Sequence, residues 1–145
     1  MKYFLAYSFS ALIDSKTGLV DEKNRQFLED MRNSILDKKA DIFLAHFREK
    51  WGKELMTADE CTFDDFKEMK ESDVVLAFPG NPISGGVHIE LGWASALNKK
   101  IYLFLEKNAS YSPLIEGMKT ITDVRIVELP ENYTIETVLN AVEEI

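Results

Sequence analysis

Short apolar runs alternate along the chain with longer segments in which apolar residues recur at helical spacing. The runs fall at residues 2–7, 41–46, 74–78, 101–105 and 124–129. Within each run the apolar residues are continuous rather than alternating, which is typical of parallel strands that are covered on both faces. Each run therefore predicts a buried strand.

The segments between the runs carry apolar residues three and four positions apart, which is the pattern of amphipathic helices. They predict helices near residues 22–38, 57–71, 86–97 and 135–142, with a further short helix at 111–118. In the second of these, Phe63, Phe66 and Met69 have the spacing expected of a face that packs against the core.

Strands that alternate with helices predict a parallel sheet with helices on both of its faces. We expect an α/β fold, a flavodoxin-like (Rossmann-type) three-layer sandwich whose five-stranded parallel sheet has the order 2-1-3-4-5, in a single domain spanning residues 1–145. Such folds bind ligands beyond the carboxyl ends of their strands. The segments 8–21, 47–57 and 79–85 all follow strands, so the candidate site lies among them.

Composition narrows the class of protein. The chain has 145 residues, of which 46% are hydrophobic and 29% are charged, which suits one globular domain and excludes a disordered chain. The single cysteine, Cys61, cannot form an internal disulfide. No apolar run approaches the roughly 20 residues of a membrane span. Residues 1–7 are too short and too aromatic for a signal peptide, so we expect a cytoplasmic protein.

The charge balance bears on the partners. Seventeen basic and 25 acidic residues give a net charge of −8, which argues against binding to nucleic acid or to an anionic membrane. It is compatible with a small phosphorylated ligand, since a few local donors can hold a phosphate. We expect no cofactor and no metal site, because neither metal-ligand spacing nor a flavin-specific signature occurs in the chain.

The stretch from Phe78 to Glu90 carries the most chemical information. A strand ends there, a loop rich in Gly, Pro and Ser turns, and a helix begins. Free amides at a helix start favour an anion, and Gly85 and Gly86 would let a phosphate approach the backbone. The loop is neither a Walker loop nor a G-x-G-x-x-G fingerprint. A tight turn with Ser84 as the helix N-cap explains it equally well.

Two carboxylates are candidates for catalysis. Glu90 lies one turn into the predicted helix among apolar neighbours, which suits either a functional acid or an exposed residue favoured by the helix dipole. Asp65 lies in the preceding helix and, taken alone, fits a solvated helix face. Two carboxylates around a sugar are the usual equipment for cleavage of a glycosidic bond.

Three further side chains follow the second predicted strand. His46 ends that strand, with Arg48 and Trp51 close behind it. Together they could stack on a base and bind a polar edge of a ligand, although a lone histidine is more often simply hydrogen-bonded.

Three stretches with similar spacing resemble a known family: residues 9–18 (FSALIDSKTG), 45–52 (AHFREKWG), and 77–80 (AFPG) leading to 88–95 (HIELGWAS). Over nearly its whole length the chain resembles the nucleoside 2-deoxyribosyltransferase superfamily. It is most similar to the CMP and hydroxymethyl-CMP N-glycosidases of the mildiomycin and bacimethrin type.

The resemblance implies a retaining hydrolysis of a nucleoside 5′-monophosphate. Glu90 would be the nucleophile that attacks the anomeric carbon, and Asp65 would orient the sugar or assist proton transfer. Water would then release ribose 5-phosphate. The resemblance also implies a homodimer or higher homo-oligomer with shared active sites. The residues that it places around the substrate are Phe4, Ser8, Phe9, Ser10, His46, Arg48, Trp51, Ser84, Gly85, Gly86 and, for the partner's phosphate, Ser112.

Two positions depart from the pattern of the family. Deoxyribose-selective relatives carry a tyrosine where this chain has Phe4, and the missing phenol leaves room for a ribose 2′-hydroxyl. Many relatives have an arginine where this chain has Ser10, so a charge-assisted phosphate contact is lost.

Three functions therefore stand beside one another. The first is an N-glycosidase acting on CMP or a 5-substituted CMP, and the second is a nucleoside 2′-deoxyribosyltransferase. The third is a nucleotide-binding sensor without turnover, because a fold does not fix a function. A sensor has no need of a nucleophile, so Glu90 discriminates it from the two enzymes.

Overall fold

A computed structural model describes residues 1–80, 83–143 and 145 of the chain. Its sheet has five parallel strands in the order β2-β1-β3-β4-β5, which confirms the predicted topology. The strands are β1 (Lys2–Tyr7), β2 (Asp41–Phe43), β3 (Val74–Phe78), β4 (Lys100–Glu106) and β5 (Val124–Leu129).

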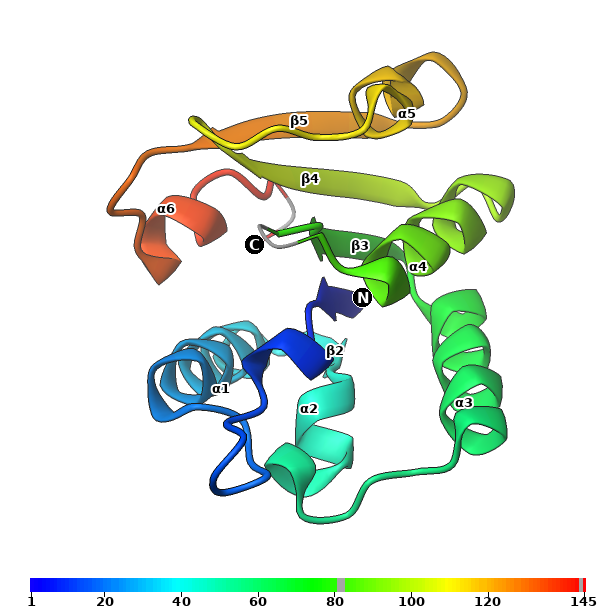
Figure 1. The fold of residues 1–145 in the computed structure, drawn as a ribbon. Helices are drawn as coiled ribbons and strands as arrows, with labels where there is room; N and C mark the ends of the chain where they lie inside the picture. The colour runs from blue at the N-terminus through cyan, green and yellow to red at the C-terminus, as the bar shows by residue number, and fades with distance from the viewer. Residues whose placement is uncertain (81–82, 144) are drawn as a thin grey trace.

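Helices cover both faces of this sheet, as Figure 1 shows, with α1 and α6 on one side and α3, α4 and α5 on the other. Within the described residues, no helix has the length and the hydropathy that a membrane span requires. The helices are α1 (Glu22–Asp37), α2 (Ala45–Arg48), α3 (Ala58–Glu71), α4 (Gly85–Ala96), α5 (Pro113–Glu116) and α6 (Ile135–Leu139).

The alternation of side chains along β1 divides the core into two clusters. Tyr3, Leu5 and the partly buried Tyr7 pack with residues of α1 and α6. Phe4 and Ala6 face the other way and pack with residues of α3, α4 and α5. The sheet therefore separates two environments, and its carboxyl edge has a distinct chemistry on each side.

The second strand is shorter than predicted. β2 ends at Phe43, and the chain enters α2 at Ala45, so His46 lies on a helix rather than at the end of a strand. Leu44 is the last extended residue, and its carbonyl accepts a hydrogen bond from the amide of Arg48 at 3.2 Å. The run of apolar residues continues past the strand because His46 is itself buried, and burial does not distinguish a strand from one helical turn.

The outer face of α3 also differs from the prediction. Met69 is buried as expected, but Phe63 is 70% exposed and Phe66 is 37% exposed. Phe66 instead meets Trp93 of α4 edge to face, with ring centroids 5.3 Å apart. Helical spacing identified the right element, but Phe66 packs against α4 at the surface and Phe63 lies exposed, so neither ring enters the core.

Two C-terminal elements are shorter than predicted. The helical segment near 111–118 is α5 followed by a 3₁₀ turn at Gly117–Thr120, and α6 ends at Leu139. Val142 is buried beyond the end of α6, so its apolar character reflects packing and not helix length.

Candidate active site

Two carboxylates on the neighbouring helices α3 and α4 are close enough for the charge of one to act on the other. Asp65 lies in the middle of α3, whose start is defined by a capping box between Thr57 and Glu60. Glu90 lies in the second turn of α4. Burial, and then the negative charge of Asp65, raise the pKa of Glu90 well above its usual value. The positive charge of Arg48 acts in the opposite direction.

Arg48 joins α2 to this pair of acids. Its Nη1 donates to Asp65 Oδ1 at 2.8 Å, and its Nη2 donates to Glu49 Oε1 at 2.9 Å. Its guanidinium also lies over the ring of Phe43, 5.2 Å from the centroid. Both terminal nitrogens of Arg48 therefore bind carboxylates of the protein, so Arg48 holds Asp65 and Glu49 in place.

Glu49 completes this arrangement and was not singled out by the sequence reasoning. It is only 7% exposed, and its second oxygen accepts a hydrogen bond from the amide of Met56 at 3.4 Å. In the sequence, the position of Glu49 directly after Arg48 is the signal that could have indicated it.

One guanidinium thus binds two acidic side chains, Asp65 and Glu49, and its charge also acts on Glu90. Burial raises the pKa of Asp65, the ion pair with Arg48 lowers it, and the charges of Glu49 and Asp64 raise it again. Arg48 is bound by both Asp65 and Glu49, and among the described residues no ion pair joins Glu90 to a cation. The site therefore favours one proton on the Glu90–Asp65 pair.

His46 connects α2 to the segment that follows β1. Its Nε2 lies 2.8 Å from the carbonyl oxygen of Ser8, and its ring stacks on Phe9 with centroids 4.6 Å apart. Because a carbonyl can only accept, Nε2 carries the proton. Burial lowers the pKa of His46 to about 4, so the ring is neutral at pH 7. Its Nδ1 is a buried acceptor without a partner among the described residues.

Trp51 lies in a strained turn that links the segments after β1 and β2. It is buried, and its backbone has a φ of 61°. Its carbonyl accepts a hydrogen bond from the amide of Val20 at 3.0 Å. Gly52 has a φ of 101°, and a Cβ there would lie 2.7 Å from the carbonyl oxygen of Gly18. The two segments therefore touch backbone to backbone.

The loop after β3 begins α4 as the N-cap interpretation predicts. Ser84 Oγ accepts a hydrogen bond from the amide of Val87 at 3.4 Å. Gly85 and Gly86 occupy the exposed first turn of the helix, where amides lack intrahelical partners. Asn81 and Pro82, in the predicted 79–85 loop, lie outside the described residues.

The remaining predicted site residues lie in three different places. Phe4 is 1% exposed and packs its ring 5.1 Å from that of Phe43. Ser10 is exposed at the start of a 3₁₀ turn. Ser112 is the N-cap of α5 and accepts a hydrogen bond from the amide of Leu114 at 3.3 Å. Their contacts with a substrate stay predictions, and that of Ser112 concerns a partner's site.

No group of three or more His, Cys, Asp or Glu side chains is placed to hold a metal ion in the part of the chain that the structure describes. The chemistry that its residues offer is that of paired carboxylates with a guanidinium between them, next to a helix start that suits an anion.

Comparisons with known proteins identify the family that the chain resembles in sequence and in fold. The sequence profile named Nucleoside 2-deoxyribosyltransferase matches residues 18–138. The structure of the Clostridium botulinum CMP N-glycosidase BcmB is 31% identical, with a TM-score of 0.72 over 97% of this chain and 95% of that one. The solution structure of BlsM is 32% identical, with a TM-score of 0.77 over 97% and 84%.

A 2-deoxyribosyltransferase from Bacillus psychrosaccharolyticus is 19% identical, with a TM-score of 0.57 over 79% of this chain and 80% of that one, which shows a shared fold alone. No curated protein matched the chain in a sequence comparison.

Proposed function

Because the chain belongs to the nucleoside 2-deoxyribosyltransferase family, we propose that it is a nucleoside 5′-monophosphate N-glycosidase that hydrolyses CMP or a 5-substituted CMP. The observation that carries the proposal is the placement of Glu90 beside the Asp65–Arg48 ion pair. The similarity to the CMP N-glycosidase BcmB supports the choice of a nucleotide and of hydrolysis.

In the proposed reaction the Glu90 carboxylate attacks the anomeric carbon of the ribose. The bond from that carbon to the base nitrogen breaks, the base takes up the proton held by the Glu90–Asp65 pair, and a glycosyl ester forms on Glu90. Water then attacks the anomeric carbon and releases ribose 5-phosphate with net retention. A partly buried carboxylate suits the first step. Poor solvation destabilises the ionised carboxylate in the free protein, and the positive charge that develops on the sugar then stabilises it.

Asp65 has a different role in this mechanism. Its Oδ1 is held by Arg48, so this carboxylate is fixed in direction and suited to orient the sugar next to Glu90. The developing charge on the sugar is positive, and both acids of the pair face it. Arg48 and Glu49 are positioning residues that keep Asp65 in place.

The start of α4 suits the 5′-phosphate of the substrate. Gly85 and Gly86 carry no side chain that would keep a phosphate from the helix amides, and α4 is 12 residues long, so its dipole favours an anion. Ser8, directly after β1, is positioned by its carbonyl, which accepts a hydrogen bond from His46 Nε2. Ser10 offers a hydroxyl where many relatives have an arginine, so the phosphate rests chiefly on backbone donors.

A second copy of the chain is the proposed partner. The outer faces of α3 and α4 expose apolar side chains, among them Phe63 at 70% and Ile89 at 57%. Ile89 precedes Glu90, so a partner seated on this surface would lie next to the acid pair and would keep water from it. An assembly with shared sites is also what the family resemblance implies.

The test is release of free base, measured by chromatography. Incubation with CMP is expected to give cytosine and ribose 5-phosphate, with cytidine a poorer substrate because it lacks the phosphate. Glu90→Ala should abolish release, whereas Glu136→Ala, on the exposed face of α6, should leave it intact. Release by Glu90→Ala at the rate of the unmodified protein would remove Glu90 as the nucleophile.

The same assay separates hydrolysis from transfer. With dCMP or a deoxynucleoside and a second free base present, a transferase forms the exchanged nucleoside, whereas a hydrolase forms the free sugar. If nucleotides raise the melting temperature but no base is released or exchanged, the protein is a nucleotide-binding sensor.

A further inference from the structure

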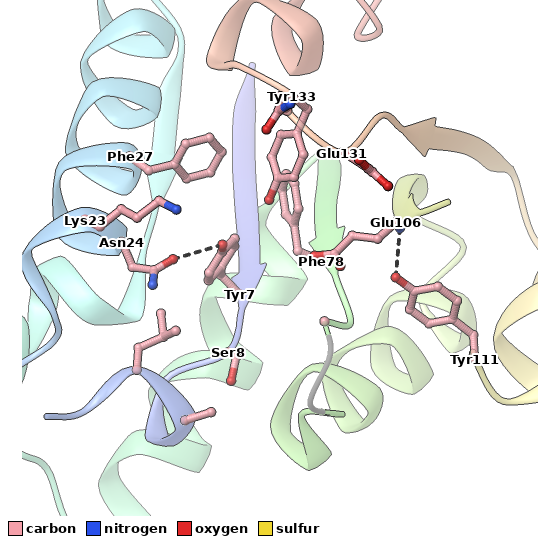
Figure 2. A pocket seen from close by; sticks show the side chains of 14 residues that line it. Tyr7, Ser8, Lys23, Asn24, Phe27, Phe78, Glu106, Tyr111, Glu131 and Tyr133 are labelled. Carbon is pink, nitrogen blue, oxygen red and sulfur yellow. Dashed lines mark hydrogen bonds between the residues drawn. The ribbon is translucent and has the colours of Figure 1, made fainter. Parts of the chain in front are cut away.

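A cavity of about 520 Å³ opens at the carboxyl edge of the sheet, on the α1 and α6 side. Figure 2 shows it between α1 and the segments that follow β4 and β5. Tyr7, which lines it, packs with the core cluster of α1 and α6, whereas Val87 and Leu91 of α4 belong to the other cluster. The cavity and the helix that carries Glu90 therefore lie on opposite sides of the sheet, although Ser8, at the edge of the sheet, lines the cavity.

The walls of this cavity are aromatic. The ring of Tyr7 lies 5.2 Å from that of Phe78 and 6.1 Å from that of Phe27, measured between centroids. Phe27 meets Tyr133 edge to face at 5.8 Å. Rings from β1, β3, α1 and the segment before α6 thus converge on one space, and an aromatic face attracts a cation.

The phenols in the walls are held by hydrogen bonds. The hydroxyl of Tyr7 donates to Asn24 Oδ1 at 3.3 Å, and the hydroxyl of Tyr111 accepts from the amide of Glu106 at 2.8 Å. Both bonds are drawn in Figure 2. Fixed rings of this kind lose little conformational entropy when a ligand binds, so the cavity is formed in advance.

The charges around the cavity favour a positive ligand. Glu106 and Glu131 lie on one wall, and Lys23 lies across from them on α1 (Figure 2). Burial raises the pKa of both Tyr7 and Tyr133, and the charge of Glu106 acts in the same direction on each. The potential on the carboxylate wall is therefore negative, and nothing in the proposed mechanism uses it.

We propose that this cavity binds a small organic cation, an ammonium group carried on a flat apolar body. The apolar body would lie against Phe27, Phe78 and Tyr133, and the ammonium group would face Glu106 and Glu131. The volume falls within the range of roughly 300–1,000 Å³ of small-molecule sites. Lys23 lies across the cavity from Glu106 and Glu131, so its ammonium group does not compete with the ligand for these carboxylates. It instead limits the length of the ligand.

The test compares two molecules of the same shape. 2-Phenylethylammonium carries the charge, and 2-phenylethanol replaces it with a hydroxyl. Titrations followed by saturation-transfer NMR, on the full chain without nucleotide, should show the ammonium binding about tenfold tighter than the alcohol. If the ammonium and the alcohol bound with equal affinity, or if the ammonium did not bind at millimolar concentration, the proposal would be overturned by the unmodified protein alone.

Variants locate the binding. Glu106→Gln combined with Glu131→Gln should weaken the ammonium about tenfold and leave the alcohol unchanged, whereas Glu136→Gln, outside the cavity, should change neither. Phe27→Leu should weaken the ammonium, because it removes one aromatic face while keeping an apolar side chain at that position. Glu90→Ala should bind it as the unmodified protein does. If Glu90→Ala lost binding of the ammonium, or if the double variant of Glu106 and Glu131 kept it, the cation would bind elsewhere and the proposal would be contradicted.

Discussion

The Nη1 atom of Arg48 lies 2.8 Å from Oδ1 of Asp65, and this contact joins the short helix α2 to the middle of α3. The side chains of both residues are only 20% and 17% exposed. The same guanidinium also holds Glu49, so its position is determined from two directions. The relationship makes Arg48 the balancing charge of the acid pair, in addition to any contact with a substrate.

Replacement of Arg48 by methionine should lower kcat/KM for base release by about 10²-fold. Arg48 lowers the pKa of both Glu90 and Asp65, so its loss should also move the acid limb of the pH profile to higher pH. Arg48→Lys should recover part of the rate, since an ammonium keeps the charge but lacks the fork that binds two partners. Arg125→Met, on the exposed surface of β5, is the control. An unshifted profile in Arg48→Met would contradict this role.

Glu90→Gln should stabilise the protein at neutral and alkaline pH. The pKa of Glu90 is raised in the folded chain, so the folded state holds the proton more tightly than the unfolded state does. Stability is then lost as pH rises from the unfolded value, about 4.3, through the folded value. The glutamine variant lacks this loss, so its melting temperature should exceed that of the unmodified protein increasingly from pH 4 to pH 8. If the melting temperatures of the two proteins changed with pH in parallel, the pKa of Glu90 would not be raised in the folded protein.

His46 gives the opposite dependence on pH. Its pKa in the folded protein is about 4 because the ring is buried, below the unfolded value of about 6.5. The unfolded state therefore binds the proton first, and stability falls as pH decreases from about 6.5 to 4. His46→Gln retains a donor for the Ser8 carbonyl and does not titrate, so its unfolding free energy should fall less over this window. Urea unfolding at several pH values measures the difference, and an equal fall in both proteins would contradict it.

The backbone contact between the segments after β1 and β2 should be sensitive to one methyl group. Gly52→Ala would place a Cβ 2.7 Å from the carbonyl oxygen of Gly18 at a φ of 101°. Gly18→Ala meets no atom within 4 Å, so it carries only the strain of its positive φ of 69°. Gly18→Ala should cost about 1 kcal/mol in urea unfolding, and Gly52→Ala about 3 kcal/mol. Equal losses would mean that the segments do not touch.

The proposed assembly depends on the apolar surface of α3 and α4. Phe63→Glu should shift the protein toward the monomer in sedimentation equilibrium, because a charge would be buried in the interface. Leu55→Glu, at a position that is 66% exposed outside these helices, should leave the assembly unchanged. If sites are shared, the Phe63 variant should also lose base release on dilution. A monomeric unmodified protein would refute the proposed partner.

Local patterns predicted much of the fold and part of the site. Continuous apolar runs predicted the five strands, and Ser84 was placed correctly as the cap of α4, because both depend on neighbours in the chain. The order of the strands followed from the fold class expected when strands alternate with helices. The end of β2 at Phe43 was missed, because a buried histidine continued the apolar run. The outward turn of Phe63 was missed because the face of a helix is set by what packs against it.

The sequence by itself determined the alternation of strands and helices, the start of α4 and the two carboxylates worth testing. Only the tertiary structure decided that Arg48 is shared between Asp65 and Glu49, and that Tyr7, Phe27, Phe78 and Tyr133 surround one cavity. The physical reason is distance along the chain. Periodicity reports which side of an element is buried, whereas an ion pair or a cavity depends on how separate elements meet in space.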